Sequence, residues 1–279
     1  MPLKADNSSR TLGLIAGMGD LPKAVASEAK RMGYKVVAVA LQPPADESLK
    51  PFADDFHKIK IGRLGGLITL LKKLSITEAV MAGKVPKGLI YKNKKDIIPD
   101  LTMARVFFSL KNLSDDTIMN GFVGELEKNG VMLHKTITFT ENLLCSEGVL
   151  TTKKPSRKDL QNIDFGWSIA KEMGKLDIGQ TVVVKNMAVM AIEAIEGTDE
   201  AIKRGGNLAQ KDAVVIKVSK PGQDMRFDVP VLGLDSLDSM KACGAKVLAF
   251  EAGKCIIVDK ANFIKKADKY GLVVAAVKK

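Results

Sequence analysis

Carboxylates and cations alternate with apolar residues in one short stretch of the C-terminal half of this chain. Asp224, Arg226 and Asp228 stand two residues apart, with an apolar residue in each gap. Because the side chains of an extended segment alternate between its two faces, the pattern predicts a strand with one charged face. Lys217 and Lys220 precede it, so cations that bind phosphate lie beside carboxylates that bind a divalent metal. This combination favours phosphate-ester or diphosphate chemistry.

Two interpretations of this charged segment remain open. In the first, Asp228 holds a metal ion or acts as a base while Arg226 steadies a phosphate. In the second, the charged side chains form the ion-paired outer face of an edge strand, which contributes little to stability. Pro230 favours an edge position because a proline cannot donate to a strand ladder.

A glycine-rich turn after the first predicted strand, Gly17-Met18-Gly19-Asp20-Leu21-Pro22, is a second candidate site. A strand that runs directly into a helix exposes backbone amides, which can bind a phosphate or nucleotide. The simpler interpretation is a tight turn followed by a helix-starting proline. Pro22 replaces the third glycine of the dinucleotide fingerprint and Gln42 replaces its acidic residue, so NAD is disfavoured. The candidate ligand-binding residues here are Gly17, Gly19, Leu21 and Pro22.

Two further segments carry residues suited to ligand binding. Gly83 and Lys84 follow another predicted strand, where α/β proteins place their ligands, and we assign both to a ligand. The lysines at 92, 94 and 95 are interpreted as a solvated loop. Glu193 and Glu196 lie close together before a predicted helix, and Glu196 is a candidate metal ligand. The alternative there is a simple helix cap formed by Thr198, with acidic residues favoured by the helix dipole.

Composition limits the classes of partner. The 279 residues include 46% hydrophobic and 27% charged residues, which is typical of a globular protein. A formal net charge of +11 predicts an anionic partner, while only 5% aromatic residues disfavours a stacking surface for single-stranded nucleic acid. Three scattered cysteines and two histidines disfavour zinc and favour an oxygen-preferring ion such as Mg²⁺. No signal region or long apolar run is found, so we expect a cytoplasmic protein.

Hydrophobic periodicity predicts an α/β fold with two domains. In the first half, short β-rich runs alternate with helical spacing, which favours a mostly parallel, helix-covered sheet. The strands expected there are 12–16, 36–41, 57–61, 78–82 and 131–135, and the helices are 21–32, 64–74 and 115–129. The second half is expected to contain helices 157–173, 200–204 and 260–270, a hairpin of 181–184 with 187–191, and strands 213–218, 247–258 and 272–277. The predicted boundaries are a polar lead (1–11), an N-terminal domain (12–135), a linker (136–155) and a C-terminal domain (156–279).

Several motifs in combination resemble the LpxI family, the UDP-2,3-diacylglucosamine diphosphatases of lipid A biosynthesis. They are Gly13-Leu14-Ile15-Ala16-Gly17-x-Gly19-x-Leu21-Pro22, Leu176-Asp177-Ile178-Gly179-Gln180, Glu193-Ala194-Ile195-Glu196-Gly197-Thr198-Asp199 and Lys220-Pro221-x-Gln223-x-Arg226-x-Asp228-x-Pro230-x-x-Gly233. The resemblance runs over nearly the whole chain from about Leu12 onward. It implies a Rossmann-like N-terminal domain and a distinct, mixed α/β catalytic domain.

The resemblance also implies an activity: Mg²⁺-dependent hydrolysis of UDP-2,3-diacylglucosamine to UMP and 2,3-diacylglucosamine 1-phosphate (lipid X), with substrate held between the domains. The family's essential aspartate corresponds to Asp228, beside Arg226 and Lys220 as further catalytic candidates. The motifs imply substrate contacts for Gln180, Thr198, Asp199 and Gln223. A diphosphate must have its charge neutralised before water attacks it. The candidate cations for this task are Lys84, Lys217, Lys220, Arg204 and Arg226.

These expectations extend to partners. The lipid-linked UDP-sugar is the expected substrate, no nucleic acid is expected, and a positive surface would favour peripheral contact with the inner membrane. A homodimer is expected because two-subunit assemblies are the commonest oligomers. Two other functions are considered: a nicotinamide-dependent oxidoreductase built on the first domain, and a non-catalytic binder of anionic lipid.

Overall fold

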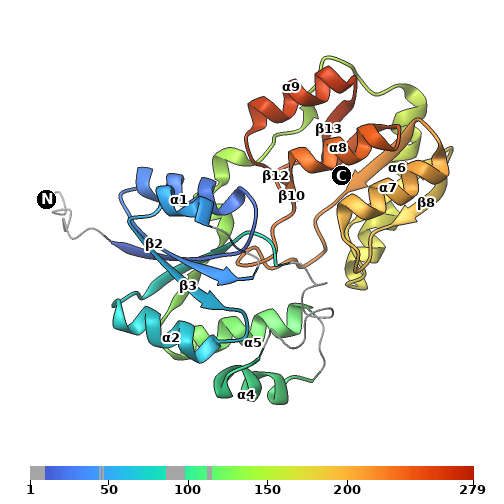
Figure 1. Cartoon of the computed structure of the whole chain (residues 1–279). Coiled ribbons are helices and arrows are strands. Elements are labelled where there is room, and N and C mark those ends of the chain that lie inside the picture. Colours follow the sequence, from blue (N-terminus) through green and yellow to red (C-terminus); the bar gives the residue numbers. More distant parts are fainter. Residues whose placement is uncertain (1–9, 44, 46, 86–97, 112–114) are drawn as a thin grey trace, which may run out of the picture. The chain divides into compact units, whose positions relative to one another are not determined.

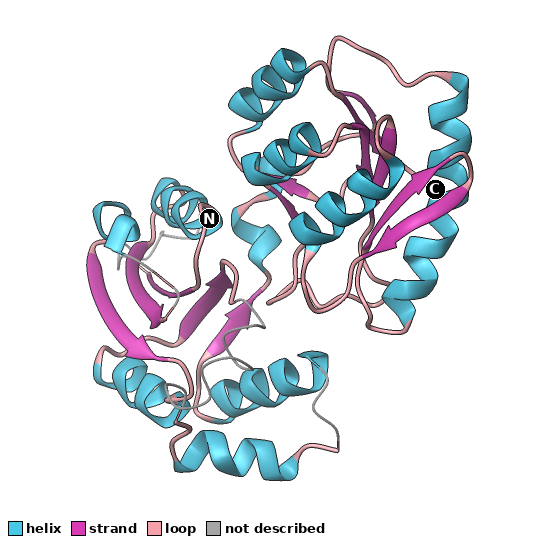
Figure 2. Cartoon of the chain, turned by 45° about the vertical axis from the view of Figure 1, so that its right-hand side comes forward, coloured by secondary structure: helices cyan, strands magenta, loops and turns pink. Residues whose placement is uncertain are grey.

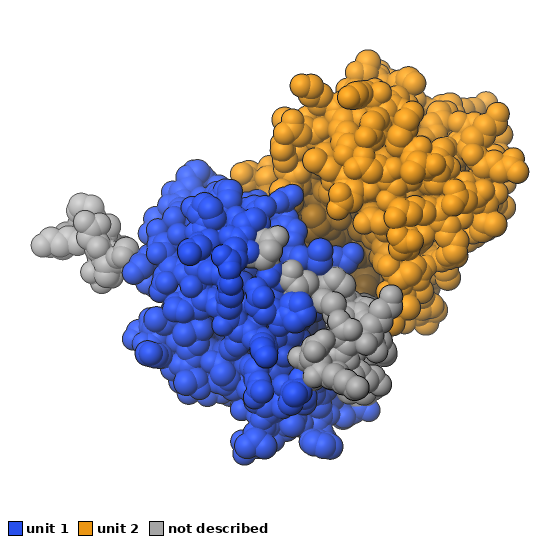
Figure 3. All heavy atoms as spheres, in the orientation of Figure 1, with its two compact units in different colours: residues 1–140, 225–227 blue, residues 141–224, 228–279 orange. Residues whose placement is uncertain are grey.

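The computed structural model describes residues 10–43, 45, 47–85, 98–111 and 115–279. The chain divides into two compact units, of which the first comprises Met1–Thr140 with Met225–Phe227 and the second Glu141–Asp224 with Asp228–Lys279 (Figure 3). The lysines at 92, 94 and 95 and most of the polar lead lie outside the described residues. Among the helices that the structure describes, none is both long and apolar enough to cross a membrane.

The first unit contains a five-stranded parallel sheet with strand order β3-β2-β1-β4-β5. The strands are β1 (Thr11–Ala16), β2 (Lys35–Gln42), β3 (Asp55–Lys60), β4 (Glu78–Ala82) and β5 (Met132–His134). All five lie where the sequence predicted them. The order reverses between β1 and β4, which makes their carboxyl ends the switch point where such sheets commonly bind ligands.

Helices cover both faces of this sheet (Figure 1). The central strands β1 and β2 are apolar on both faces, as a covered parallel sheet requires. Helix α1 packs on one face, and α2 and α5 contribute to the core on the other, where α4 joins them. The sequence did not predict α4. The helices are α1 (Leu21–Arg31), α2 (Leu64–Lys73), α4 (Leu101–Ser109) and α5 (Asp115–Lys128), with the 3₁₀ turns η1 (Glu47–Phe52) and η2 (Thr136–Phe139).

The second unit contains a six-stranded mixed sheet with strand order β6-β13-β11-β9-β7-β8. Strands β9, β11 and β13 are parallel, β7 is antiparallel to β8 and β9, and β6 is antiparallel to β13. The strands are β6 (Gly148–Val149), β7 (Thr181–Lys185), β8 (Ala188–Ile192), β9 (Ala213–Lys217), β11 (Ala245–Glu251) and β13 (Val273–Val277). A separate parallel pair joins β10 (Val231–Leu232) and β12 (Ile256–Ile257). The α/β class with a distinct mixed second domain is therefore confirmed.

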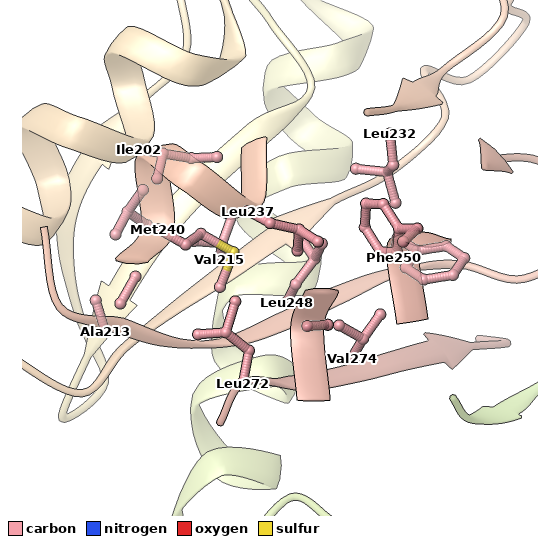
Figure 4. Close-up of a cluster of buried hydrophobic side chains, with 14 of the residues drawn as sticks. Ile202, Ala213, Val215, Leu232, Leu237, Met240, Leu248, Phe250, Leu272 and Val274 are labelled. Atoms are coloured by element: carbon pink, nitrogen blue, oxygen red, sulfur yellow. The ribbon is translucent and has the colours of Figure 1, made fainter. Parts of the chain in front are cut away.

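Alternating residues of this sheet face two different helical layers (Figure 2). Val215, Leu248 and Val274 share a core with residues of α7, α8 and α9 (Figure 4). Their neighbours Val214 and Val247 pack against α6 on the opposite face. Period-two alternation thus places both faces of β9, β11 and β13 in a core. The helices are α6 (Arg157–Lys175), α7 (Thr198–Ala209), α8 (Leu234–Ala242) and α9 (Lys260–Tyr270).

Some boundaries differ from the sequence-based expectation. The expected linker 136–155 contains η2, a second 3₁₀ turn η3 (Glu141–Leu143) and strand β6. The expected strand 247–258 is two strands, β11 and β12, and α8 was not predicted. The β7–β8 hairpin is confirmed, and it turns at Asn186 and Met187, whose φ angles are +51° and +56°. Such positive φ angles produce the turn whose twist matches a two-residue hairpin.

Candidate active site

One edge of the six-stranded sheet gathers the polar residues of the second unit. Strands β8, β9 and β11 run in the same direction, so their carboxyl ends lie at this edge, and the opposed β7 begins there. Carboxyl ends of parallel strands are the usual position of ligand sites in α/β sheets. Of the residues predicted from the sequence, the fold brings to this edge Gln180, Glu196, Thr198, Asp199, Arg204, Lys217, Lys220, Gln223 and Asp228.

The segment between β9 and β10 is a folded loop, not the charged strand that the alternation predicted. Pro221 and Gly222 form a turn, in which Gly222 has a φ of +75°. The amide of Asp228 then donates to the carbonyl of Asp224 at 2.9 Å, closing a second turn around residues 225–227. The prediction of an extended face is wrong because local turns bond backbone groups that a strand ladder would otherwise pair.

Within this loop, Lys220 lies between two carboxylates. Its Nζ is 2.6 Å from Asp177 Oδ1 and 3.5 Å from Asp228 Oδ2. The side chain of Lys220 is only 11% exposed, against 28% for Asp177 and 31% for Asp228. Partly buried charges are screened less by salt than exposed ones, so these three groups interact effectively. The Lys220 ammonium is therefore already held in place beside Asp228.

Gln223 links this loop to the residue before β7. Its Oε1 accepts hydrogen bonds from Ser219 Oγ at 2.8 Å and from the amide of Lys220 at 2.9 Å. Its Nε2 lies 3.4 Å from Gln180 Oε1, and the Gln180 carbonyl accepts from the amide of Val218 at 3.0 Å. Gln180 and Gln223, for which the resemblance implied substrate contacts, therefore contact each other and fix the start of the loop.

A buried ion pair holds the same end of the loop. Glu251, the last residue of β11, is 5% exposed, and its Oε2 accepts from the Ser219 amide at 2.8 Å and from Lys171 Nζ at 2.5 Å. Lys171 also donates to the Ser219 carbonyl at 2.8 Å. Burial raises the pKa of Glu251, but the hydrogen bonds from Lys171, Ser219 and Lys254 and the positive charge of Lys171 together outweigh this effect, so its pKa lies below the ordinary value.

The far end of the loop is held by Lys217, which is 5% exposed. Its Nζ donates to Thr198 Oγ1 at 2.9 Å and to the carbonyl of Val231 at 3.2 Å. The Thr198 hydroxyl donates in turn to Glu193 Oε1 at 2.9 Å. Gly197 is the N-cap of α7, so the alternative interpretation, in which Thr198 caps this helix, is wrong. The burial of Lys217 and Thr198 favours a supporting role beneath the loop.

The remaining charged residues at this edge are also paired. Arg204 Nη2 lies 2.5 Å from Glu196 Oε1 and donates to the Ile192 carbonyl at 2.8 Å. Burial raises the pKa of Glu196, but the hydrogen bond and positive charge of Arg204, together with backbone hydrogen bonds, outweigh this effect, so the pKa of Glu196 is below the ordinary value. Asp199 Oδ1 accepts from Ser236 Oγ at 2.7 Å. A metal ion or phosphate would have to compete with these partners for Glu196, Asp199 or Arg204.

Arg226 has its contacts in the first unit. Its Nη1 lies 2.9 Å from Glu127 Oε1 of α5, and its carbonyl accepts from Thr136 Oγ1 at 3.3 Å. Phe227 packs against the core formed by α2 and α5. The tripeptide 225–227 is therefore held by the first unit, whereas the residues on either side of it belong to the second.

In the first unit, Gly17 and Gly83 allow two strand ends to approach closely. A Cβ on Gly17 would lie 2.7 Å from the Lys84 carbonyl oxygen, and a Cβ on Gly83 would lie 2.8 Å from the Gly17 carbonyl carbon. The backbones of Met18 and Lys84 exchange hydrogen bonds of 3.0 and 2.9 Å. These bonds join the ends of β1 and β4 across the switch point. Both glycines thus have a packing role, and their predicted ligand contacts stay predictions.

The other predicted residues of the first unit differ in accessibility. Gly19 has a φ of +97°, and a Cβ there would meet no atom within 4 Å. Lys84 is exposed just past β4. Leu21 and Pro22 are buried in the first turn of α1. A ligand can therefore reach Gly19 and Lys84, whereas Leu21 and Pro22 support the helix.

The edge of the second unit suits a weakly held Mg²⁺ ion. Mg²⁺ keeps several water molecules and is usually held by one or two carboxylates together with substrate phosphates. Asp177 and Asp228 already converge on one positive charge, the Lys220 ammonium. Across the described ranges, no group of three or more His, Cys, Asp and Glu side chains could hold a metal. The two carboxylates could supply only part of the coordination of an Mg²⁺ ion, and the predicted metal site stays a prediction.

Sequence reasoning overlooked Asp177, Glu251 and Lys171. A signal for Asp177 was present, because it lies in the family motif Leu176-Asp177-Ile178-Gly179-Gln180. No local signal marked the Lys171–Glu251 pair, whose members are 80 residues apart in sequence. Such pairs become visible only when the sheet brings α6 and the end of β11 together.

Comparison with solved structures gives only weak likenesses. An ADP complex of N5-carboxyaminoimidazole ribonucleotide synthetase is 18% identical, with a TM-score of 0.28 over 70% of this chain and 34% of that chain. The N5-carboxyaminoimidazole synthetase of Staphylococcus aureus is 19% identical, with a TM-score of 0.24 over 74% of this chain and 46% of that chain. Scores this low carry no argument about fold or function.

Comparison at the level of sequence is specific. The LpxI N-terminal domain matches residues 11–143, and the LpxI C-terminal domain matches residues 146–275. A Caulobacter vibrioides protein named UDP-2,3-diacylglucosamine pyrophosphatase LpxI is 31% identical over 281 residues, covering 96% of this chain and 98% of its own length. With both domains matched in order and nearly all of the chain aligned, this protein belongs to the LpxI family.

Proposed function

We propose that this protein hydrolyses the diphosphate of UDP-2,3-diacylglucosamine to UMP and 2,3-diacylglucosamine 1-phosphate, a step of lipid A biosynthesis. The name of the Caulobacter relative supports the substrate and the bond cleaved. The observation that carries the assignment is the group of Asp228, Lys220 and Asp177 at a ligand-binding edge of the second unit. It combines a cation for the phosphate with carboxylates for a metal ion or water.

The chemistry expected of these residues follows from the charge of the substrate. A diphosphate resists attack by water until its negative charge is neutralised, and a preorganised ammonium does this without reorganising during the reaction. Lys220 supplies that charge in a partly buried position. Asp228 orients the attacking water and takes its proton, or holds the metal ion. Gln180 and Gln223 keep the loop in the conformation that presents both residues.

We further propose that the reaction depends on Mg²⁺. When bound, Mg²⁺ supplies charge neutralisation at the phosphoryl oxygens and a more acidic water. Asp228 is the residue best placed to hold it, because its carboxylate already approaches a cation without closing on it. Glu196 remains a candidate ligand, although Arg204 engages its carboxylate.

The direct test is release of UMP from UDP-2,3-diacylglucosamine by the purified protein. We expect UMP and the lipid monophosphate in equal amounts, no product in EDTA, and recovery after addition of Mg²⁺. A folded protein that releases no UMP with Mg²⁺ present would contradict the assignment. Activity unaffected by EDTA would contradict only the metal dependence.

We also propose that the protein acts from the cytoplasm by touching the surface of the inner membrane through α4. Leu101 and Phe108 of this helix are 77% and 91% exposed. Arg105, also exposed, shares their helical face, because residues three and four apart are neighbours on a helix. Large apolar side chains beside cations are typical of helices that lie at an anionic lipid surface.

Vesicle sedimentation tests this contact. Wild-type protein should sediment with vesicles that contain anionic phospholipid. The Leu101→Ser, Phe108→Ser double variant should bind these vesicles about 30- to 150-fold more weakly, since it loses about 2–3 kcal/mol of apolar burial. Leu208→Ser is the matched control, because Leu208 is also exposed but lies on α7. Equal sedimentation of the α4 variant and wild type would contradict the proposal.

The homodimer expected from the sequence also stays a proposal. It rests on the frequency of twofold assemblies among enzymes. Light scattering at several protein concentrations tests it: a mass near twice the 30.1 kDa of the chain supports a dimer, and a mass near 30.1 kDa contradicts it.

A further inference from the structure

We infer that Asp177 is a positioning residue of the diphosphatase centre. Its carboxylate holds the Lys220 ammonium beside Asp228 and prevents Lys220 and Asp228 from forming a tight ion pair. The inference rests on the proposed function and assigns Asp177 a specific role within it. Its basis is a carboxylate placed where backbone geometry favours glycine, on a helix end that packs directly against the Lys220 turn.

The backbone at Asp177 has an unusual conformation for a residue with a side chain. Asp177 follows the C-cap Leu176 of α6 and has a φ of +54°. The amide of Ile178 donates to the Met173 carbonyl and that of Asp177 to the Gly174 carbonyl, each at 3.2 Å. This pattern is a Schellman motif, in which the residue at the position of Asp177 is usually glycine.

A left-handed conformation costs a residue with a Cβ about 1 kcal/mol or more relative to glycine. The chain therefore keeps Asp177 at a conformational cost that glycine would avoid. A carboxylate that points at a lysine gives a physical reason for the exception. Strained positions of this kind concentrate at functional sites, and here the strain is an observed φ angle.

The helix end and the Lys220 turn are also built to approach closely. A Cβ on Gly174 would lie 3.1 Å from Lys220 Cα and 3.2 Å from Pro221 Cδ, tighter than most real contacts. Glycine at 174 therefore lets the last turn of α6 rest on the backbone of the loop that carries Asp228. The approach brings the Asp177 carboxylate within reach of Lys220.

The two distances at Lys220 indicate what this arrangement does. Its ammonium is 2.6 Å from Asp177 and 3.5 Å from Asp228. The closer contact is a charge-assisted hydrogen bond, while the longer one is an electrostatic contact only. Asp177 thus takes the stronger interaction and leaves Asp228 available to a water or a metal ion. Without Asp177, Lys220 would be drawn onto Asp228 or away into solvent.

A double-mutant cycle tests whether Asp177 acts through Lys220. Asp177→Asn tolerates the left-handed backbone and removes only the charge. We expect it to lower kcat for UMP release about 10- to 100-fold, the usual cost of losing a residue that orients a catalytic group. In the Lys220→Met background, Asp177→Asn should lower kcat less than about threefold, because the effects of mutations at two interacting residues are not additive.

Two matched variants separate the carboxylate from the backbone. Asp177→Gly relieves the strain and should be as stable as wild type or more stable, yet lose activity like Asp177→Asn. Asp212→Asn changes another exposed aspartate with positive φ in the same unit, at +56°, and should keep wild-type activity. The inference would be overturned if the Asp177→Asn variant kept a kcat within twofold of wild type. It would also be overturned if Asp177→Asn lowered kcat by the same factor in the wild-type and Lys220→Met backgrounds.

A second measurement does not depend on turnover. Acetylation of Lys220 by an amine-reactive reagent, followed by mass spectrometry, reports how firmly the ammonium is held, with exposed Lys203 as reference. Asp177→Asn should raise the rate of acetylation at Lys220 about threefold or more, as expected for the loss of a charge-assisted hydrogen bond. If the wild type released no UMP, the proposed function would fail, and an unchanged acetylation rate alone would overturn the inference.

Discussion

The two units of this protein use similar sheets in different ways. Each has parallel strands between helices, and each was expected to bind substrate where strands end. In the first unit the ends of β1 and β4 are joined by backbone hydrogen bonds between Met18 and Lys84. In the second, the strand ends open into loops whose charged side chains form networks around Lys217, Lys220 and Glu251.

Glycines at strand ends have two different roles in this protein. A glycine after a strand can mark a phosphate-binding turn or a place where two backbones touch. The spacing of glycines in the sequence does not distinguish these two roles. Gly17 and Gly83 belong to the second kind by their contacts, whereas Gly19 keeps open space. In the second unit the informative residues are paired charges. We therefore expect chemistry to be most sensitive there, and stability to be most sensitive at the glycine contact.

Removing one cation from each unit tests this contrast most strongly. Lys220→Met should lower kcat/KM about 100-fold or more, because it removes a preorganised charge from the reacting phosphate. Lys84→Met should cost less than about tenfold, since an exposed charge contributes about 1 kcal/mol or less. Steady-state kinetics of UMP release measures both. A larger loss for Lys84→Met would reverse the assignment of chemistry to the second unit.

Changing either of two glycines of the first unit to alanine separates the effect of close packing from that of backbone conformation. Gly83→Ala should destabilise the protein by about 3 kcal/mol or more, because its Cβ would overlap the Gly17 backbone at a φ of +94°. Gly19→Ala has a similar φ but open space, so it should cost only about 1–2 kcal/mol. Urea unfolding gives both values. Equal losses of stability in the two variants would contradict a packing role for Gly83 and would leave backbone conformation as the only cause.

The Lys171–Glu251 pair makes a prediction about pH. The lowered pKa of Glu251 means that its charge stabilises the fold above about pH 4.5, and that this stabilisation is lost as pH falls through the folded-state pKa. Glu251→Gln should therefore be about 1–3 kcal/mol less stable than wild type at pH 7, with the difference shrinking toward pH 3. Urea unfolding at both pH values checks this, and a difference independent of pH would contradict it.

The smallest effect concerns the buried thiols. Burial raises the pKa of Cys255 to about 12, so almost no thiolate exists at neutral pH. A thiol reagent at pH 8 should leave Cys255 unmodified in the folded protein and react with it fully in urea, as peptide mass spectrometry would show. Rapid labelling of Cys255 without denaturant would indicate that the core of the second unit opens readily.

Much of the fold could be predicted from the sequence because its strands are short, strongly β-favouring runs bounded by turns. Helices α4 and α8 were missed, since Leu101–Ser109 and Leu234–Ala242 lack a long run of helical periodicity. The charged segment around Asp228 was assigned the wrong local structure. A period of two over six residues fits a strand, but Pro221, Gly222 and a local hydrogen bond fold it into turns.

The candidate site was predicted only in part, for a related reason. Residue types and motifs identified Lys220, Gln223 and Asp228, which the loop brings together. Motifs did not reveal Asp177 as the partner of Lys220, because that pairing depends on how closely α6 approaches the loop at Gly174. Contacts between distant segments are set by packing, which no local pattern encodes.

The most direct test of the account is UMP release by Asp228→Asn, with Asp224→Asn as the matched control at the start of the same turn. Both changes preserve side-chain size and remove one charge. Loss of a positioned acid–base or metal-binding group predicts a fall in kcat of about 1,000-fold for Asp228→Asn at unchanged stability. Asp224→Asn should stay within about tenfold of wild type. Near-normal turnover by a folded Asp228→Asn protein would contradict the central claim that the second unit carries the chemistry at this residue.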